Sequence, residues 1–347
     1  MAISAGSDSR FRRVMMKRHR PLLPVLFMLV MPVLHEGALG QTTSDDATAT
    51  EGALFLLLPV GAQGVSVGRA MTARGSAESA FWNPAGLAGV SESRLLVMRG
   101  DYLAGEATAL SGLVVRDPVG VIALSYQLLD GGDQDLTDRD GNVRGAISVR
   151  SHVGMISFAT SLTSWLDVGF SGKLIRFNLN CRGQCNDAGV QSTGWAIDLG
   201  AQIQPFPGLP LRLGAMLAHL GPDFQVVNAE QADPLPTRVR VSAAYDLFQY
   251  FGNADAFDLW AQVEVEDRWT GPGRSPSFYA GTEFIAGTGS LISVRSGYVR
   301  GEVGQADGFA VGVGLRFERF DLGLAKSLAG SIAAEREPVH VSFSIVF

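Results

Sequence analysis

The chain lacks a long hydrophobic run beyond its first 40 residues. No later stretch is apolar over the ~18 residues that a membrane helix requires, although hydrophobic residues make up 46% of the 347-residue sequence. Backbone polar groups inside a bilayer must be hydrogen-bonded within the protein, which leaves closed sheets as the other way to cross. If the chain after residue 40 enters a membrane, it must therefore do so as strands.

Residues with catalytic or metal-binding chemistry are also scarce. The sequence has five histidines and two cysteines, and it contains no Walker loop, Rossmann fingerprint or GxSxG motif. His340 and Ser342 alternate onto one face of a predicted strand, but no third group is placed to orient them. We predict no enzyme, no cofactor and no metal site. The formal net charge of −6 gives no reason to expect a nucleic-acid partner.

Residues 1–40 have the three parts of a secretory signal peptide. Six arginines and lysines lie between residues 10 and 20, an apolar core follows at 21–34, and Ala38, Leu39 and Gly40 are small or apolar residues before a predicted cut ahead of Gln41. The alternative is an uncleaved anchor, which Pro24 and Pro32 disfavour. We expect export across the inner membrane, followed by a disordered lead-in at 41–50.

The two cysteines, Cys181 and Cys185, are four positions apart in a predicted loop. With no histidine nearby they do not make a zinc site. An oxidising envelope compartment favours a disulfide that tightens the loop, with free thiols as the alternative.

Several segments alternate strictly between apolar and polar residues, as a strand with two different faces does. In the last one, Val339, Val341, Phe343 and Ile345 share a face and end at Phe347. Similar alternation predicts about fourteen strands, near 94–102, 106–116, 119–129, 148–160, 165–177, 192–204, 210–220, 237–247, 256–267, 277–285, 291–299, 308–317, 319–327 and 339–347.

The predicted connections mostly alternate between short turns and long loops rich in Gly, Asp, Pro or Asn. Such sorting is typical of an outer-membrane barrel with long loops outside and both termini in the periplasm. We therefore predict an all-β fold in which residues 91–347 form a single antiparallel transmembrane β-barrel; a soluble all-β fold is the alternative. The terminal Phe347 resembles the signal by which barrel assembly machinery recognises its substrates.

Residues 51–90 fit neither a long helix nor a strand. Glycines interrupt the segment repeatedly, and the Asn83-Pro84 pair disfavours helix at position 83. Irregular backbone needs partners for its polar groups, which a barrel wall can supply. We interpret 51–90 as a glycine-rich plug, or hatch, inside or beneath the barrel.

The plug carries a family resemblance. The run FLLLPVGA at 55–62, Gly68 and the run WNPAGLA at 82–88 resemble the N-terminal signature of the PorV/PorQ family, which belongs with the FadL-type outer-membrane barrels. Where relatives usually have Gly-Ala-Arg, a Gly-Met-Gly-Gly run and a paired Asp, this chain has GAQ at 61–63, VGR at 67–69 and GSAE at 75–78, so roles of those residues are not carried over. The motif residues to which we assign the plug's fixed point are Phe81, Trp82, Asn83, Pro84, Ala85 and Gly86.

Charged residues on two neighbouring predicted strands are expected to line the lumen. Antiparallel pairing brings Arg240 opposite Glu264 and Arg238 opposite Glu266, to within a residue or two of register. Mutual neutralisation of this charge ladder is the structural interpretation. The functional alternative is a polar constriction that orients a ligand head group.

The predicted loop 130–147 is rich in aspartate, at positions 130, 133, 135, 138 and 140. The glycines do not fall at EF-hand spacing, so we favour a solvated acidic loop over a calcium site. Such a loop would repel neighbouring lipopolysaccharide or bridge it through divalent ions.

Two functions remain open. Resemblance to FadL-type barrels implies a passive outer-membrane channel or binder for hydrophobic small molecules, held beside the plug. Resemblance to PorV/PorQ implies a non-transporting accessory barrel of a type IX-like protein-secretion or surface-attachment system, with secretion proteins as partners of the long loops.

Overall fold

The computed structural model describes residues 51–102, 105–184, 189–226, 232–251, 257–269, 276–301, 307–328 and 338–347. These belong to one compact unit, Thr48–Phe347. The predicted signal peptide and lead-in, residues 1–50, lie outside the described residues and stay predictions.

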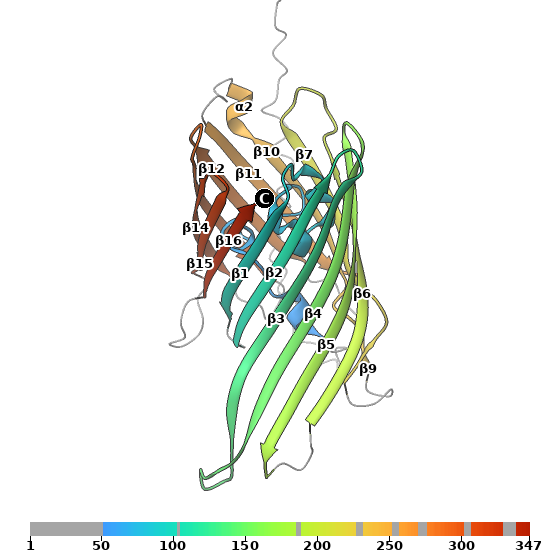
Figure 1. The fold of residues 1–347 in the computed structure, drawn as a ribbon, viewed down its shortest axis with the longest axis vertical. Coiled ribbons are helices and arrows are strands. Elements are labelled where there is room, and N and C mark those ends of the chain that lie inside the picture. Colours follow the sequence, from blue (N-terminus) through green and yellow to red (C-terminus); the bar gives the residue numbers. More distant parts are fainter. Residues whose placement is uncertain are drawn as a thin grey trace, which may run out of the picture. The chain divides into compact units, whose positions relative to one another are not determined.

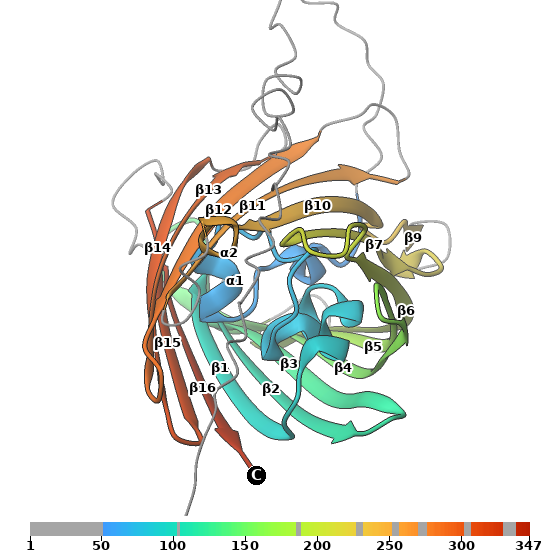
Figure 2. The same ribbon diagram turned by 90° about the horizontal axis from the view of Figure 1, so that it is seen from above.

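Among the described residues, fourteen strands close into one antiparallel barrel (Figures 1 and 2). The predicted fold class is confirmed. The barrel strands are β1 (Arg94–Tyr102), β2 (Gly105–Arg116), β3 (Gly120–Thr137), β4 (Val143–Thr163), β5 (Leu166–Gly183), β6 (Gly189–Ile203), β7 (Leu211–Leu220), β10 (Arg238–Asp246), β11 (Phe257–Arg268), β12 (Ser277–Ala286), β13 (Leu291–Arg300), β14 (Gly308–Phe317), β15 (Phe320–Ser327) and β16 (Val339–Val346).

Each strand pairs with its neighbours in sequence, and β1 closes the ring against β16 from Arg94↔Val346 to Gly100↔His340. The short strands β8 (Phe224–Gln225) and β9 (Ala232–Asp233) form a separate pair, so β7 lies beside β10. We call the end that carries the β2–β3, β12–β13 and β14–β15 connections the short-turn end; the helix α2 (Leu247–Phe251) and the C-terminus lie there (Figure 1). The opposite end is the long-loop end.

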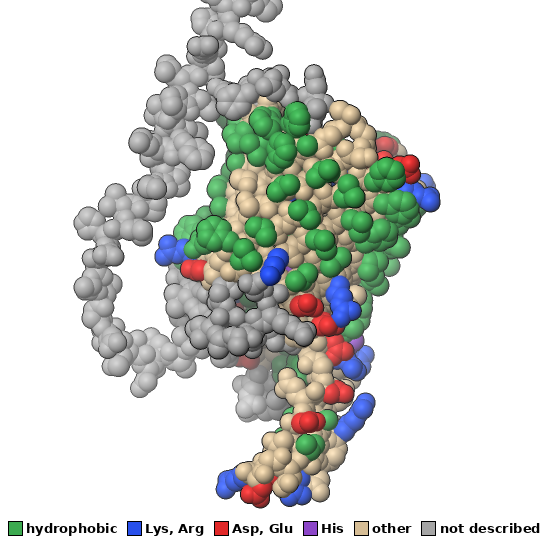
Figure 3. Space-filling model, turned by 90° about the vertical axis from the view of Figure 1, so that its left-hand side faces the viewer, with side chains coloured by type: hydrophobic (Ala, Val, Ile, Leu, Met, Phe, Trp, Pro, Cys, Tyr) green, Lys and Arg blue, Asp and Glu red, His purple; other side chains and the backbone are tan. Residues whose placement is uncertain are grey.

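The outer wall of the barrel is apolar. Val241 and Phe309 are 57% and 61% exposed, whereas the alternating Arg240 and Gln262 are buried in the lumen. Figure 3 shows apolar side chains spread over the wall. An apolar outside with polar residues inside is the arrangement of a transmembrane barrel. Among the described residues, no helix is long and apolar enough to span a membrane.

Three adjacent strands, β3 to β5, run well past the predicted boundaries, and the next, β6, begins at Gly189 instead of residue 192. β3 to β6 have 18, 21, 18 and 15 residues, whereas a tilted strand needs only ~9 to 11 to cross a bilayer. The predicted loops 130–147 and 178–191 are therefore partly strand, with a bulge between Asp130 and Asp133. This extension projects from the long-loop end and carries charged side chains (Figures 1 and 3).

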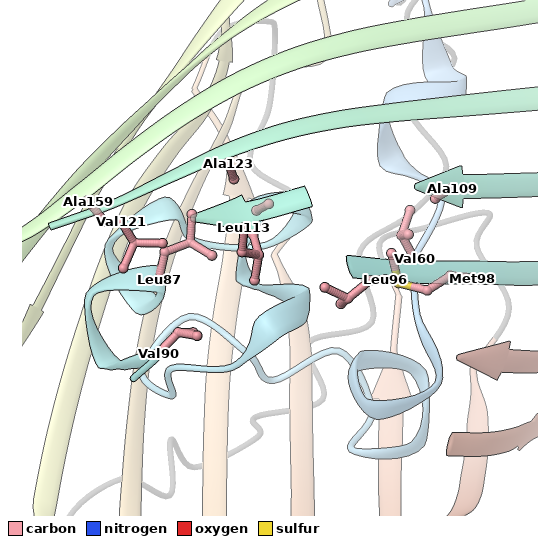
Figure 4. Close-up of a cluster of buried hydrophobic side chains, with 11 residues drawn as sticks. Val60, Leu87, Val90, Leu96, Met98, Ala109, Leu113, Val121, Ala123 and Ala159 are labelled. Atoms are coloured by element: carbon pink, nitrogen blue, oxygen red, sulfur yellow. The ribbon is translucent and has the colours of Figure 1, made fainter. Parts of the chain in front are cut away.

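Residues 51–90, which we call the N-terminal segment, lie within the ring of strands (Figure 2). They form four short helices: η1 (Leu54–Leu57), α1 (Ala62–Ser66), η2 (Ala77–Phe81) and η3 (Pro84–Gly89). Apolar side chains fix η3 to the wall, since Leu87 packs in one cluster with Leu113 and Val121 (Figure 4). Burying one such leucine stabilises the packed state by about 1.5–3 kcal/mol.

Glycines in the wall allow close approach of the segment. A Cβ on Gly281 would lie 2.2 Å from the Val67 carbonyl oxygen, and one on Gly297 would lie 2.0 Å from the Gly68 nitrogen. Gly68 itself has a φ of +62°, which favours glycine. The segment and the wall thus meet backbone to backbone along β12 and β13.

Candidate ligand site in the barrel lumen

Asn83 joins three parts of the chain. Its Oδ1 accepts a hydrogen bond from the Ala85 nitrogen at 3.1 Å, which caps η3, and Pro84 occupies the first helical position. Its Nδ2 donates to the carbonyl oxygens of Thr72 at 2.7 Å and Ala201 at 3.4 Å. A Cβ on Gly200 would collide with Asn83 Oδ1. The lack of a side chain at position 200 therefore leaves the space that the Asn83 side chain occupies against the wall.

The neighbouring motif residues are buried except for Phe81, which is half-buried. Trp82 is buried, its Nε1 donates to the Val60 carbonyl oxygen at 2.9 Å, and its ring fills the space above Gly64. Phe81 packs beside Trp82 in the same apolar cluster, and Ala85 is fully buried. A side chain on Gly86 would meet Ser79 Oγ at 2.6 Å.

Glu78 is a site residue that sequence reasoning did not select. Its buried carboxylate accepts hydrogen bonds from the backbone nitrogens of Gln63 and Gly64, at 3.2 and 2.9 Å, and from Ser342 Oγ at 2.8 Å. Burial raises the pKa of Glu78 above its ordinary 4.5, against the effect of these donors. The sequence signals were a carboxylate among the small residues of 75–80 and its place where PorV/PorQ relatives usually have a paired Asp.

His340 and Ser342, which the sequence places on one strand face, make separate contacts. Ser342 Oγ accepts from the Ala62 nitrogen at 2.7 Å and donates to Glu78, so it anchors the N-terminal segment to β16. His340 is buried, with its ring edge-on to Tyr102 at 5.2 Å between centroids.

The predicted charge ladder lies in the lumen near the long-loop end, and its pairing differs from the prediction by two residues. Arg240 lies opposite Glu266 and Ser242 opposite Glu264, so the Arg240–Glu264 pairing is shifted by two residues, within the range predicted. Strand alternation alone fixes the face of each residue but not the register. Arg240 Nε lies 2.5 Å from Glu266 Oε2, so the two side chains form an ion pair. Within the described residues, this nitrogen makes no hydrogen bond.

The other two ladder residues bind the N-terminal segment. Arg238 lies opposite Arg268 and donates from both terminal nitrogens to Glu51, at 2.7 Å each, while its Nε is 3.9 Å from Glu266. Glu264 accepts from the nitrogen and Oγ1 of Thr72, both at 2.8 Å. The ladder therefore fastens the segment as well as pairing its own charges.

Two further buried charge groups on neighbouring strands, β5 to β7 and β12 to β13, were not predicted, because strand alternation does not fix which residues of adjacent strands meet. Lys173 Nζ lies 2.6 Å from Asp198 Oδ2 and 3.1 Å from His219 Nδ1. Glu283 binds both Arg74 and Arg295.

A small cavity, which we call the outer cavity, lies between the N-terminal segment and the wall near the long-loop end. It has a volume of about 20 Å³, close to the space for one water. Its lining includes Leu56, Leu57, Leu58, Phe81 and Met216 together with Arg240. No residue of η1 is fully buried, so half-buried apolar side chains occupy this part of the lumen.

The remaining predicted residues lie on the periphery. Cys181 lies near the end of β5, and Cys185 lies outside the described residues, so the disulfide stays a prediction. Asp138 holds a turn by accepting from the nitrogens of Asp140 and Asn142, at 3.0 and 2.9 Å, and these bonds lower its pKa. The nitrogen of Phe347 donates to the Ser93 carbonyl oxygen; its role in assembly stays a prediction.

Comparison with known proteins identifies the fold. No protein-family model and no curated protein matches the chain. Solved structures that match include the "CymD monoaromatic hydrocarbon channel", with a TM-score of 0.57 at 13% identity over 86% of this chain and 99% of that chain.

The toluene transporter TbuX of Ralstonia pickettii has a TM-score of 0.55 at 13% identity, over 81% of this chain and 98% of its own. A FadL homologue of Pseudomonas aeruginosa has a TM-score of 0.55 at 10% identity, over 84% and 99%. At such identities the likeness shows a shared FadL-like barrel fold. The closer resemblance to PorV/PorQ rests on the motif at 55–88 alone.

Proposed function

We propose that this protein is a passive channel for small hydrophobic molecules in an outer membrane of the Gram-negative type, closed in this form by the N-terminal segment. The observation that carries the proposal is the apolar helix η1, half-buried in the lumen beside the outer cavity. An apolar ligand would gain by covering these leucines, since burial of apolar surface drives such binding. Structural neighbours described as hydrocarbon channels and toluene transporters support the same class of ligand.

The outer cavity is too small for such a ligand, so uptake requires movement of η1. Leu54, at the start of η1, is exposed, and the neighbouring residues 55–58 are only half-buried. Segments with few buried contacts open at low free-energy cost. We expect the ligand to take the place of these leucines while the tightly bonded Asn83 region stays fixed.

Blocking the outer cavity tests this proposal. Met216→Trp would fill the space beside Leu57, and Leu174→Trp is the matched control because Leu174 lies on the lipid-facing wall. In cells whose outer membrane carries lipopolysaccharide, uptake of the apolar fluorescent probe N-phenyl-1-naphthylamine should drop with Met216→Trp only. Equal uptake by both folded variants would contradict the proposal. Arg240→Ala tests the head-group role of the ladder in the same assay.

The accessory role in protein secretion is the second candidate, and the extension of β3 to β6 favours it. These strands carry exposed charged residues well beyond the length needed to cross a bilayer. A partner protein at the outer surface would contact this extension first. Binding of secreted proteins to cells that display the barrel, lost when the extension is shortened, would support this role.

A further inference from the structure

A second and larger cavity lies at the short-turn end, between the N-terminal segment and the wall formed by β12 to β16 and β1. Its volume is about 300 Å³. We call it the inner cavity. Like the outer cavity, which is lined by Arg69, Arg240 and Glu266, it has more arginines than carboxylates: its charged lining residues are Arg74, Arg94, Arg295, Arg316, Glu78, Glu283 and Asp321.

The carboxylates of this lining are already engaged. Glu283 binds Arg74 and Arg295, the latter at 2.5 Å, and Asp321 binds Arg316 at 2.9 Å. Glu78 is held by the donors of α1 and Ser342, and burial favours its neutral form. Four guanidinium groups therefore face three carboxylates, which leaves at least one positive charge in excess.

Within the described residues, Arg94 is the one arginine of the four that forms no ion pair with any of these three carboxylates. Its side chain is only 9% exposed, yet its one ion pair among the described residues is with Glu92, at 3.3 Å, whose side chain is 57% exposed. Arg94 Nε has no hydrogen-bond partner within the described part of the chain. A buried cationic donor without a partner is unfavourable, and an anion beside it would offset that cost.

Part of the lining of the inner cavity is apolar, close in sequence to Arg94. Val90 and Leu96 line it, and both are buried members of the apolar cluster of Figure 4. A ligand that matches both the arginines and the apolar residues of this lining has an anionic group and a small apolar body. Guanidinium presents a fork of donors that matches a carboxylate, and one excess charge matches a monoanion better than a dianionic phosphate.

From this geometry we infer that the inner cavity binds the carboxylate of a small amphipathic acid, with Arg94 as its principal donor. This inference is independent of the proposed channel function, because an uncharged hydrophobic molecule has no anionic group for Arg94 to bind. It adds a second ligand site at the other end of the lumen from η1.

Binding of 4-fluorobenzoate to the full chain in neutral detergent, followed by fluorine NMR, tests the inference. Arg94→Gln should weaken binding by at least about tenfold, the value expected on loss of a charge-assisted hydrogen bond. Arg99→Gln is the matched control: it removes the same charge from the same strand, but its side chain is 60% exposed and paired with Glu106. The uncharged 4-fluorobenzyl alcohol should bind weakly to every form.

Equal affinity of the Arg94→Gln and Arg99→Gln variants for 4-fluorobenzoate would overturn the inference, as would equally tight binding of the alcohol. Tighter competition by inorganic phosphate than by benzoate would overturn the choice of a carboxylate. Arg94→Lys keeps the charge and loses the fork, so it provides a second variant with an expected intermediate affinity. Failure here leaves the Met216→Trp uptake result untouched, so the two proposals are tested separately.

Discussion

At the scale of single residues, Glu78 organises the start of α1. Its carboxylate gathers two backbone N–H groups of residues 63 and 64 and the hydroxyl of Ser342 on β16. A side chain at Gly61 would collide with this carboxylate, at 2.2 Å from Glu78 Cδ. The N-terminal segment is thereby joined both to itself and to the wall through one acidic group.

Glu78→Ala should loosen this junction. Each buried donor left without a partner costs about 1–3 kcal/mol, so a loss of about 2 kcal/mol would speed exchange of the Gly64 amide hydrogen roughly 30-fold. Hydrogen exchange followed by mass spectrometry measures this, with Glu92→Ala as the exposed control. Unchanged exchange of the Gly64 amide in the Glu78→Ala protein would show that Glu78 does not hold the start of α1.

The same carboxyl predicts a dependence on pH. Because burial raises the pKa of Glu78 above 4.5, the folded segment prefers the protonated form. Its contribution to stability is therefore fully present below pH 4.5 and is lost as the pH rises through the raised pKa. After correction for intrinsic exchange rates, protection at Gly64 should decline over that range, and Glu78→Gln should abolish the dependence.

Residue roles were predictable where they depend on local sequence. Asn83-Pro84 predicted a turn, and Asn83 caps η3. The alternation of β10 and β11 placed Arg240 and Glu266 on one face, but their pairing depends on a register that the turn between the strands sets. Lys173 was missed because its contact with Asp198 depends on the register of β5 and β6, and Glu78 because its partner Ser342 lies on β16, far away in sequence.

At the scale of elements, the backbone contact between the N-terminal segment and β12 sets the segment's position. Gly281→Val would place a side chain within 2.2 Å of the Val67 carbonyl oxygen, and such overpacking costs about 1–3 kcal/mol or more. We expect this variant to keep the barrel and displace the segment, seen as protease cleavage between residues 61 and 75. Gly154→Val, which meets no atom within 4 Å, is the control and should stay protected.

The extension of β3 to β6 is expected to be separable from the barrel. Asp133 pairs with Ser148, so residues 134–147 can be replaced by an Asn-Gly turn at that level. The shortened protein should still migrate as a folded, heat-modifiable barrel and take up the apolar probe normally. A loss of folding would show that the extension is part of the barrel's stability.

The strands themselves were largely predictable, and the extension was not. Strands in the membrane alternate between lipid and lumen, so β1 and β14 match their predicted bounds. Both faces of the extension are polar, so residues 131–137 carry no alternation and resembled a loop. Their strand structure comes from pairing with β4, which no local pattern records.

The molecule as a whole is a barrel with an apolar outer wall, and its own N-terminal segment lies within the ring of strands (Figure 2). An apolar outer wall and a polar lumen follow from the sequence pattern. The segment is attached by Asn83 near η3, by Glu78 near α1 and by the charge ladder at Glu264. Of the four helices of the segment, η1 is the one with no buried residue, which is why we assign to it the movement that admits a ligand.

Single-channel conductance of the intact chain and of a variant lacking residues 51–90 shows whether the N-terminal segment closes the barrel. The intact barrel should be closed to ions while still taking up the apolar probe, and the deletion variant, once shown to be folded by heat-modifiable migration, should conduct. An intact barrel that conducts freely, or a folded deletion variant that stays closed, would contradict the claim that this segment closes the channel.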